Sequence, residues 1–145
     1  MHSARRARGF TLFELLVVIV LIGMCVGLVG LGVGKGLHTA SERRALSEVV
    51  QALRAARVQA IVTGQPARTR FDLRQRTVQA PGKPLSHWPN DWNVHLQTAE
   101  GLGAAFEFYP DGGASGGNVS ITREQRQWRV DVNWLTGAVS LRDVP

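Results

Sequence analysis

One uncharged apolar segment constrains this chain more than any other feature of its sequence. Residues 15–34 are twenty consecutive residues without a charged or strongly hydrogen-bonding side chain. A helix rises about 1.5 Å per residue, so twenty residues extend roughly 30 Å, the thickness of a bilayer's hydrocarbon core. We therefore expect this segment to cross a membrane.

The length and the cysteine count limit what else the chain contains. A chain of 145 residues has room for one small soluble domain beside the apolar segment. The single cysteine, Cys25, lies inside that segment. A disulfide within the chain and a cysteine-rich zinc site are therefore excluded.

Flanking charges leave the orientation of the segment open. Three basic residues precede it and three follow within the window that the positive-inside rule counts: Arg5, Arg6, Arg8, Lys35, Arg43 and Arg44. A conventional secretory signal is the alternative, since small residues at 32–34 weakly match a cleavage site.

Glu14 is the most informative single residue, because apolar residues precede it and the uncharged segment follows. An ionised acid deep in a bilayer costs about 2.5–3.5 kcal/mol, so such residues usually have a partner and a function. The alternative is a carboxylate at the membrane interface, where a helix N-terminus favours negative charge by about 0.3–1 kcal/mol.

The sequence around Glu14 resembles the class III signal of the type IV pilin and pseudopilin families. Residues 5–16 read RRARGFTLFELL: a basic leader that ends in Gly9, then aromatic Phe10, then glutamate as the fifth residue of the mature chain. The resemblance implies that a prepilin peptidase cuts between Gly9 and Phe10 on the cytoplasmic side and methylates the new amine of Phe10. It also implies that the Glu14 carboxylate pairs with such an amine on an adjacent subunit and helps to set their axial register.

A helical pattern follows the apolar segment. Apolar residues recur every three or four positions: Leu46, Val49, Val50, Leu53, Ala56, Ala60 and Ile61. No proline interrupts residues 10–63, so we expect one long helix, ended by Gly64 and Pro66. Six glycines between 23 and 36 weaken it, and we expect local melting near residues 30–36.

The remainder of the chain shows the two-residue alternation of strands. Apolar residues alternate with polar ones in six short runs: Thr69–Leu73, Trp92–Leu96, Ala104–Phe108, Val119–Ile121, Trp128–Trp134 and Val139–Leu141. Two stretches look irregular, Pro81–Asn90 and Asp111–Gly117. One polar face per strand predicts antiparallel sheets closed over the helix stripe. The expected fold is therefore α+β, a long N-terminal helix packed on a small antiparallel β-sandwich.

A second resemblance narrows the family. Residues 106–119, FEFYPDGGASGGNV, form a strand, a Pro-Asp-Gly turn, a small-residue loop and another strand. They resemble the shared domain of minor pseudopilin H of type II secretion and of its minor type IV pilin relatives. The implied organisation is a leader at 1–9, a transmembrane and filament-core helix at 10–36, and a periplasmic domain at 37–145, with an amphipathic helix at 37–63 and a β-domain at 66–145.

Few residues suggest catalysis or metal binding. His87, Asp91 and His95 are close in sequence, but their spacing fits no helix face, and surface residues on a loop are the favoured interpretation. Asp111 precedes glycines without a second carboxylate or a following lysine, so we expect a turn with positive φ rather than a calcium or phosphate loop. We therefore expect no enzyme activity, no metal and no cofactor.

The charge distribution raises one competing function. Residues 35–76 carry nine basic and three acidic side chains, whereas residues 77–145 carry five and seven. A basic patch could bind acidic partners or DNA. Some minor pilins bind DNA through basic residues near the C-terminus, but this end, GAVSLRDVP, has one arginine beside an aspartate.

The resemblance implies a structural subunit of the type II secretion pseudopilus tip, in the bacterial inner membrane, with the N-terminus cytoplasmic and the C-terminal domain periplasmic. The implied partners are other minor and major pseudopilins, the prepilin peptidase, the inner-membrane secretion platform and, as further candidates, the secreted substrates. DNA is not an expected partner. The alternatives are a minor type IV pilin for pilus initiation or DNA uptake and a membrane-anchored enzyme.

Overall fold

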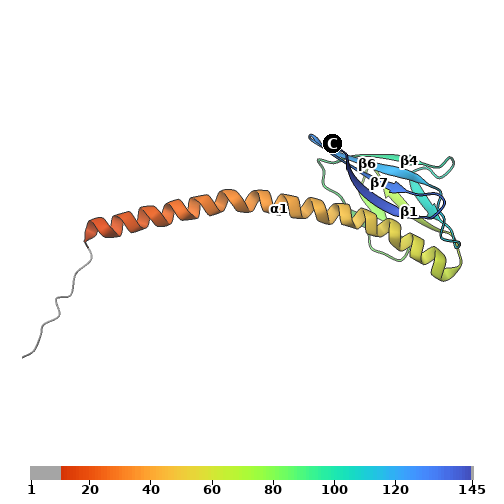
Figure 1. Cartoon of the computed structure of the whole chain (residues 1–145), viewed down its shortest axis with the longest axis horizontal. Helices are drawn as coiled ribbons and strands as arrows, with labels where there is room; N and C mark the ends of the chain where they lie inside the picture. Colours follow the sequence, from red (N-terminus) through yellow and green to blue (C-terminus); the bar gives the residue numbers. More distant parts are fainter. Residues whose placement is uncertain (1–10, 145) are drawn as a thin grey trace, which may run out of the picture. The chain divides into compact units, whose positions relative to one another are not determined.

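A long helix precedes all the strands of the protein. The computed structural model describes residues 11–144, apart from the side chains of residues 27–39. Helix α1 covers Leu12–Thr63, and β1 to β8 follow it within these described residues. Figure 1 shows the helix and the strands. Contacts divide the chain into two compact units, Met1–Ala40 and Ser41–Pro145.

The helix ends where the sequence predicts. Gly64 adopts a φ of 67° and donates its N–H to the carbonyl of Ala60 at 3.0 Å. This left-handed conformation closes a helix and suits glycine, which has no Cβ to clash. Pro66 follows, so the helix cannot resume.

The second half of α1 buries the predicted apolar stripe. Leu53, Ala56 and Ala60 are fully buried, and Ala45, Leu46, Val49 and Val50 are nearly so. Ile61 was expected in the same stripe, but 46% of it is exposed. One residue turns a helix by about 100°, so Ile61 faces away from its buried neighbour Ala60.

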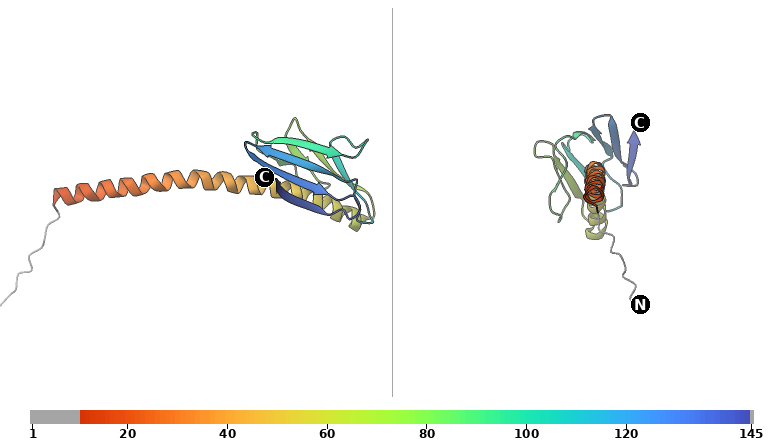
Figure 2. Two further views of the ribbon diagram at one scale, coloured as in Figure 1. Left: turned by 45° about the horizontal axis from the view of Figure 1, so that its top comes forward. Right: turned by 90° about the vertical axis from the view of Figure 1, so that its left-hand side faces the viewer.

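The strands form two antiparallel four-stranded sheets. One sheet has the order β3-β2-β1-β5 and the other β4-β6-β7-β8. Figure 2 shows the two sheets beside the second half of α1. The bounds are β1 Ala67–Asp72, β2 Thr77–Gln79, β3 Ser86–His87, β4 Asn93–Thr98, β5 Ala105–Phe108, β6 Gly117–Arg123, β7 Arg126–Val132 and β8 Val139–Val144.

Both sheets contribute to one core with the helix. Phe106 and Phe108 of the first sheet and Val119, Ile121 and Val130 of the second are fully buried in the same cluster as the helix stripe. Buried Thr69 also donates its hydroxyl to the carbonyl of Ala52 at 3.1 Å, which satisfies it and ties β1 to α1. The predicted α+β fold is confirmed.

Several strand limits differ from the expectation. Leu141, expected to end a strand, lies inside β8, which continues to Val144. The alternation was also extended to Leu73 and Trp134, but β1 ends at Asp72 and β7 at Val132, and both of these apolar residues are exposed. Alternation continued into the turns, where the ladder hydrogen bonds had already stopped. Strand β2 was not identified, and the stretch expected to be irregular, Pro81–Asn90, contains β3.

The glycine-rich segment is helical in this structure. Helix α1 continues through residues 30–36, so the expected local melting is absent there. Counting only the residues that the structure describes, no helix is long and apolar enough to cross a membrane.

Candidate functional site

The N-terminal site predicted from the sequence is described in part. Gly9 and Phe10 lie outside the described residues. Glu14 lies in the first turn of α1, where its N–H approaches the Thr11 hydroxyl at 3.3 Å and the Thr11 carbonyl at 3.0 Å. Thr11 therefore caps the helix, because its side-chain oxygen accepts one of the N–H groups that the first turn leaves free.

Glu14 forms no ion pair with another described residue of the chain. The carboxylate is exposed, and so are all the described side chains from Thr11 to Val26. Among them, Leu12 is 84% and Phe13 75% exposed. Contiguous apolar exposure of this kind is typical of surfaces that contact lipid or other protein chains.

A charge network around the buried Glu42 joins α1 to the β6–β7 hairpin. The side chain of Glu42 is only 8% exposed and pairs with Arg123 and, at 2.9 Å, with Nη1 of Arg126. Nε of Arg123 also lies 2.5 Å from Oδ2 of Asp91, within ion-pair range but outside hydrogen-bond geometry. The guanidinium of Arg126 lies over the Trp128 ring, 4.7 Å from its centroid. Charges from three separate segments therefore fix the start of the packed helix.

This network accounts for Asp91, one of the three residues considered above as a candidate metal or acid–base cluster. Asp91 pairs with Arg123, while His87 belongs to β3 in one sheet and His95 to β4 in the other. The three side chains therefore do not share a single strand or sheet. In the part of the chain that the structure describes, no three His, Cys, Asp or Glu side chains gather as metal ligands.

The Asp111 loop is a turn, as expected. Oδ1 of Asp111 accepts the N–H of Gly113 at 2.9 Å, and Gly112 has a φ of 90°. Arg57 of α1 spans this turn and the next one, since its Nε lies 3.1 Å from the Gly112 carbonyl and 3.2 Å from that of Thr136. The loop glycines thus serve packing, and the arginine bonds to main-chain oxygens.

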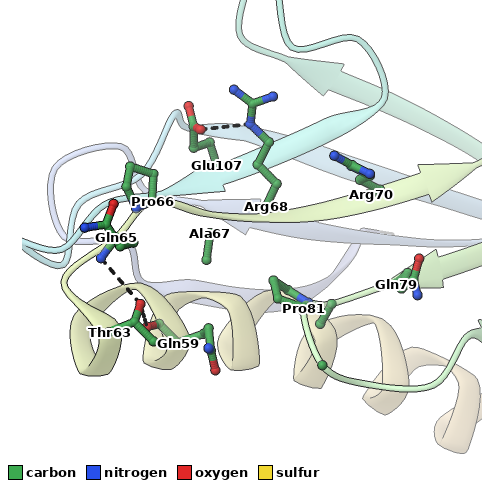
Figure 3. A pocket seen from close by; sticks show the side chains of 12 residues that line it. Gln59, Thr63, Gln65, Pro66, Ala67, Arg68, Arg70, Gln79, Pro81 and Glu107 are labelled. Carbon is green, nitrogen blue, oxygen red and sulfur yellow. Dashed lines mark hydrogen bonds and ion pairs between the residues drawn. The ribbon is translucent and has the colours of Figure 1, made fainter.

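Sequence reasoning missed a cavity at the free edge of β1. Its volume is about 810 Å³, and Figure 3 shows it between the end of α1, β1 and the segment after β2. Pro81 could have indicated it from the sequence, because proline cannot donate a main-chain hydrogen bond and so ends the pairing of two strands. Lining the cavity are Gln59, Thr63, Gln65, Pro66, Ala67, Arg68, Arg70, Gln79, Ala80, Pro81, Gly82 and Glu107.

The chain is similar to known proteins over almost its whole length. Residues 45–137 match the family described as "Type II transport protein GspH", and residues 4–30 match the "Prokaryotic N-terminal methylation motif". The chain is 35% identical over 140 residues to type II secretion system protein H of Xanthomonas campestris pv. campestris, which covers 93% of this chain and 83% of that protein.

The fold is also similar to a solved structure. The minor pseudopilin EpsH from the type 2 secretion system of Vibrio cholerae superposes with a TM-score of 0.52 at 19% identity, over 71% of this chain and 97% of that one. The family match covers the packed half of α1 and most of both sheets, and the methylation-motif match covers the segment around Glu14. The chain therefore belongs to the GspH family of type II transport proteins.

Proposed function

We propose that this minor pseudopilin is a structural subunit at the tip of the type II secretion pseudopilus and helps to export folded proteins across the outer membrane. One observation carries the proposal: a GspH domain and an N-terminal methylation motif occur in the same chain, at residues 45–137 and 4–30. Exposed apolar side chains on the first half of α1 support it, because a filament core or a membrane would cover them.

Processing is the first step of the proposed function. Residues 1–9 are a leader, and the prepilin peptidase cuts between Gly9 and Phe10 and methylates the amine of Phe10. The methylation-motif match, which spans both residues, supports this step. Cleavage on the cytoplasmic side also orients the chain, which the balanced flanking charges cannot do.

In the proposed topology, residues 10–36 cross the inner membrane and later enter the filament core, and residues 37–145 form the periplasmic domain. Glu14 then pairs with the methylated amine of a neighbouring subunit. Support comes from its exposed carboxylate, which has no ion-pair partner among the described residues. Residues 12–34 of the sequence are otherwise apolar. Such a pair is stronger in a low-dielectric environment than in water.

The proposed partners are other minor and major pseudopilins, the prepilin peptidase, the inner-membrane platform and the secreted substrates. The protein acts by assembly rather than by catalysis. A minor type IV pilin for DNA uptake has weaker support, because the C-terminal end carries a single arginine beside an aspartate.

A secretion assay tests the proposal. Deletion of the gene in its native host should abolish export of folded substrates into the medium, and the wild-type gene should restore it. Crosslinking should recover the protein with other minor pseudopilins. Normal secretion in the deletion strain, together with loss of DNA uptake, would replace this function with the type IV pilin alternative.

A further inference from the structure

An unfilled position in the first sheet lies beside β1. Strand β2 pairs with β1 at only three positions, the last being Arg70 opposite Gln79. Two residues further along each strand, the same register would place Arg68 opposite Pro81. Proline has no N–H to donate, so the ladder ends there and the first half of β1 has no neighbour on that side.

The main chain of Arg68 faces this position. On the other side of β1, Arg68 is opposite Glu107, whose N–H bonds to the Ser115 hydroxyl at 3.1 Å and whose carbonyl accepts the Ser115 N–H at 2.8 Å. Arg68 and Glu107 are therefore a pair that exchanges no main-chain hydrogen bonds. The N–H and C=O of Arg68 consequently point away from β5, toward the cavity of about 810 Å³.

The cavity combines apolar walls with unpaired positive charge. Pro66, Ala67 and Pro81 form part of its walls, and Figure 3 shows the guanidinium groups of Arg68 and Arg70 on β1. Nε of Arg68 pairs with Glu107 at 2.8 Å. In contrast, within residues 11–144 no carboxylate is placed to form an ion pair with Arg70, which is exposed.

We propose that this cavity binds a short, extended, acidic segment of a partner protein, which adds to β1 as a strand. Main-chain hydrogen bonds to Arg68 would provide affinity, as in other cases of strand addition. A carboxylate on the segment would pair with Arg70 and provide specificity for acidic sequences, because guanidinium and carboxylate groups can form two parallel hydrogen bonds. This binding site is additional to the assembly role proposed above.

Strand addition distinguishes this partner from nucleic acid. Duplex DNA would bind through contacts between its phosphates and the surface arginines, each contributing to a similar extent. It would need no strand edge with free main-chain groups. An extended peptide needs both the edge at Arg68 and the charge at Arg70. Strand addition therefore predicts that methylating the main chain of the peptide weakens binding. It also predicts that removing the charge of Arg70 weakens binding more than removing the charge of another exposed arginine.

Fluorescence anisotropy with the full-length protein in detergent micelles tests the proposal. The probe is a labelled eight-residue peptide of alternating threonine and glutamate. It should bind at least about tenfold more tightly than the same peptide with lysine in place of glutamate. A peptide with N-methyl groups on all its main-chain nitrogens should lose binding, because neither of its edges can then donate hydrogen bonds to the ladder.

Matched protein variants locate the site. Arg70→Gln should weaken peptide binding about tenfold, whereas Arg74→Gln removes the same charge from the exposed β1–β2 turn and should change it less than twofold. Unchanged tryptophan fluorescence would establish that both variants are folded. The proposal is overturned if the acidic peptide does not bind, if both variants weaken it equally, or if the methylated peptide binds as well as the original.

Discussion

The ion network at Glu42 gives a quantitative test of how the helix is fixed to the β-domain. Replacing Glu42 by alanine removes the carboxylate shared by Arg123 and Arg126. Both arginines would then lack that partner near the start of the packed helix. We expect the free energy of unfolding of the unit Ser41–Pro145 to fall.

The size of the loss follows from exposure. Removing one partner of a fully buried ion pair costs about 3–5 kcal/mol. Arg126 is 57% exposed, so water can replace its partner, while Arg123 is 20% exposed and keeps Asp91. Discounting for this solvation, we expect Glu42→Ala to cost about 2 kcal/mol, and Glu42→Gln somewhat less, because the amide oxygen still accepts a hydrogen bond.

Glu48→Ala is the matched control. It makes the same change in the same helix, so helix propensity cancels, and its partner Arg44 is 83% exposed. Its cost should be about 0.3–0.5 kcal/mol. Urea unfolding in detergent can be followed by tryptophan fluorescence, because Trp92 and Trp128 are buried in the core and become exposed on unfolding. Their ring centroids lie 6.1 Å apart. Equal costs for the two variants would refute the argument that Glu42 is a buried anchor.

The remaining predictions concern processing, assembly and backbone geometry. Mass spectrometry of protein from a peptidase-competent host should show loss of residues 1–9 and a methylated Phe10, and Gly9→Arg should leave the precursor uncut; an intact Met1 in the wild type would contradict this. Glu14→Ala should be inserted and cleaved normally but crosslink less to neighbouring pseudopilins, whereas undiminished assembly would favour a helix-dipole role. Gly117→Ala should cost at least about 3 kcal/mol in urea unfolding, because its Cβ would lie 2.1 Å from a carbonyl oxygen of β4 at a φ of 120°, while Gly101→Ala, at positive φ in open space, should cost only about 1 kcal/mol.

Much of the fold could be predicted because buried residues recur in the sequence with the period of a helix or of a strand. The helix stripe from Leu46 to Ala60 and the alternation in β5, β6 and β7 each identified buried residues. The predicted strand ends were wrong where a turn carries apolar side chains. Trp134 continues the alternation of β7, but the Asn133 side chain accepts the N–H groups of Leu135 and Thr136, each at 3.0 Å, and so forms a turn instead.

The short strands were harder to predict for a different reason. Strand β2 has three residues and β3 has two, too few to show a period. They exist because a neighbouring strand offers each of them a partner: β2 pairs with β1 across a turn, and β3 pairs with β2. This information is tertiary. The cavity beside β1 was missed with them, because it is defined by where β2 stops.

The fate of each basic residue depends on its tertiary partners and not on composition. Residues 35–76 contain nine basic side chains, which from the sequence alone suggested a basic patch. In the folded unit, Arg54 and Arg57 donate to carbonyls of Val139, Gly112 and Thr136, and are therefore structural. Arg68 is paired with Glu107, whereas Arg70 has no such partner in the described part of the chain. A count of charges therefore overstates the surface available for acidic partners, and recognition should depend on Arg70 more than on the arginines held in the core contacts.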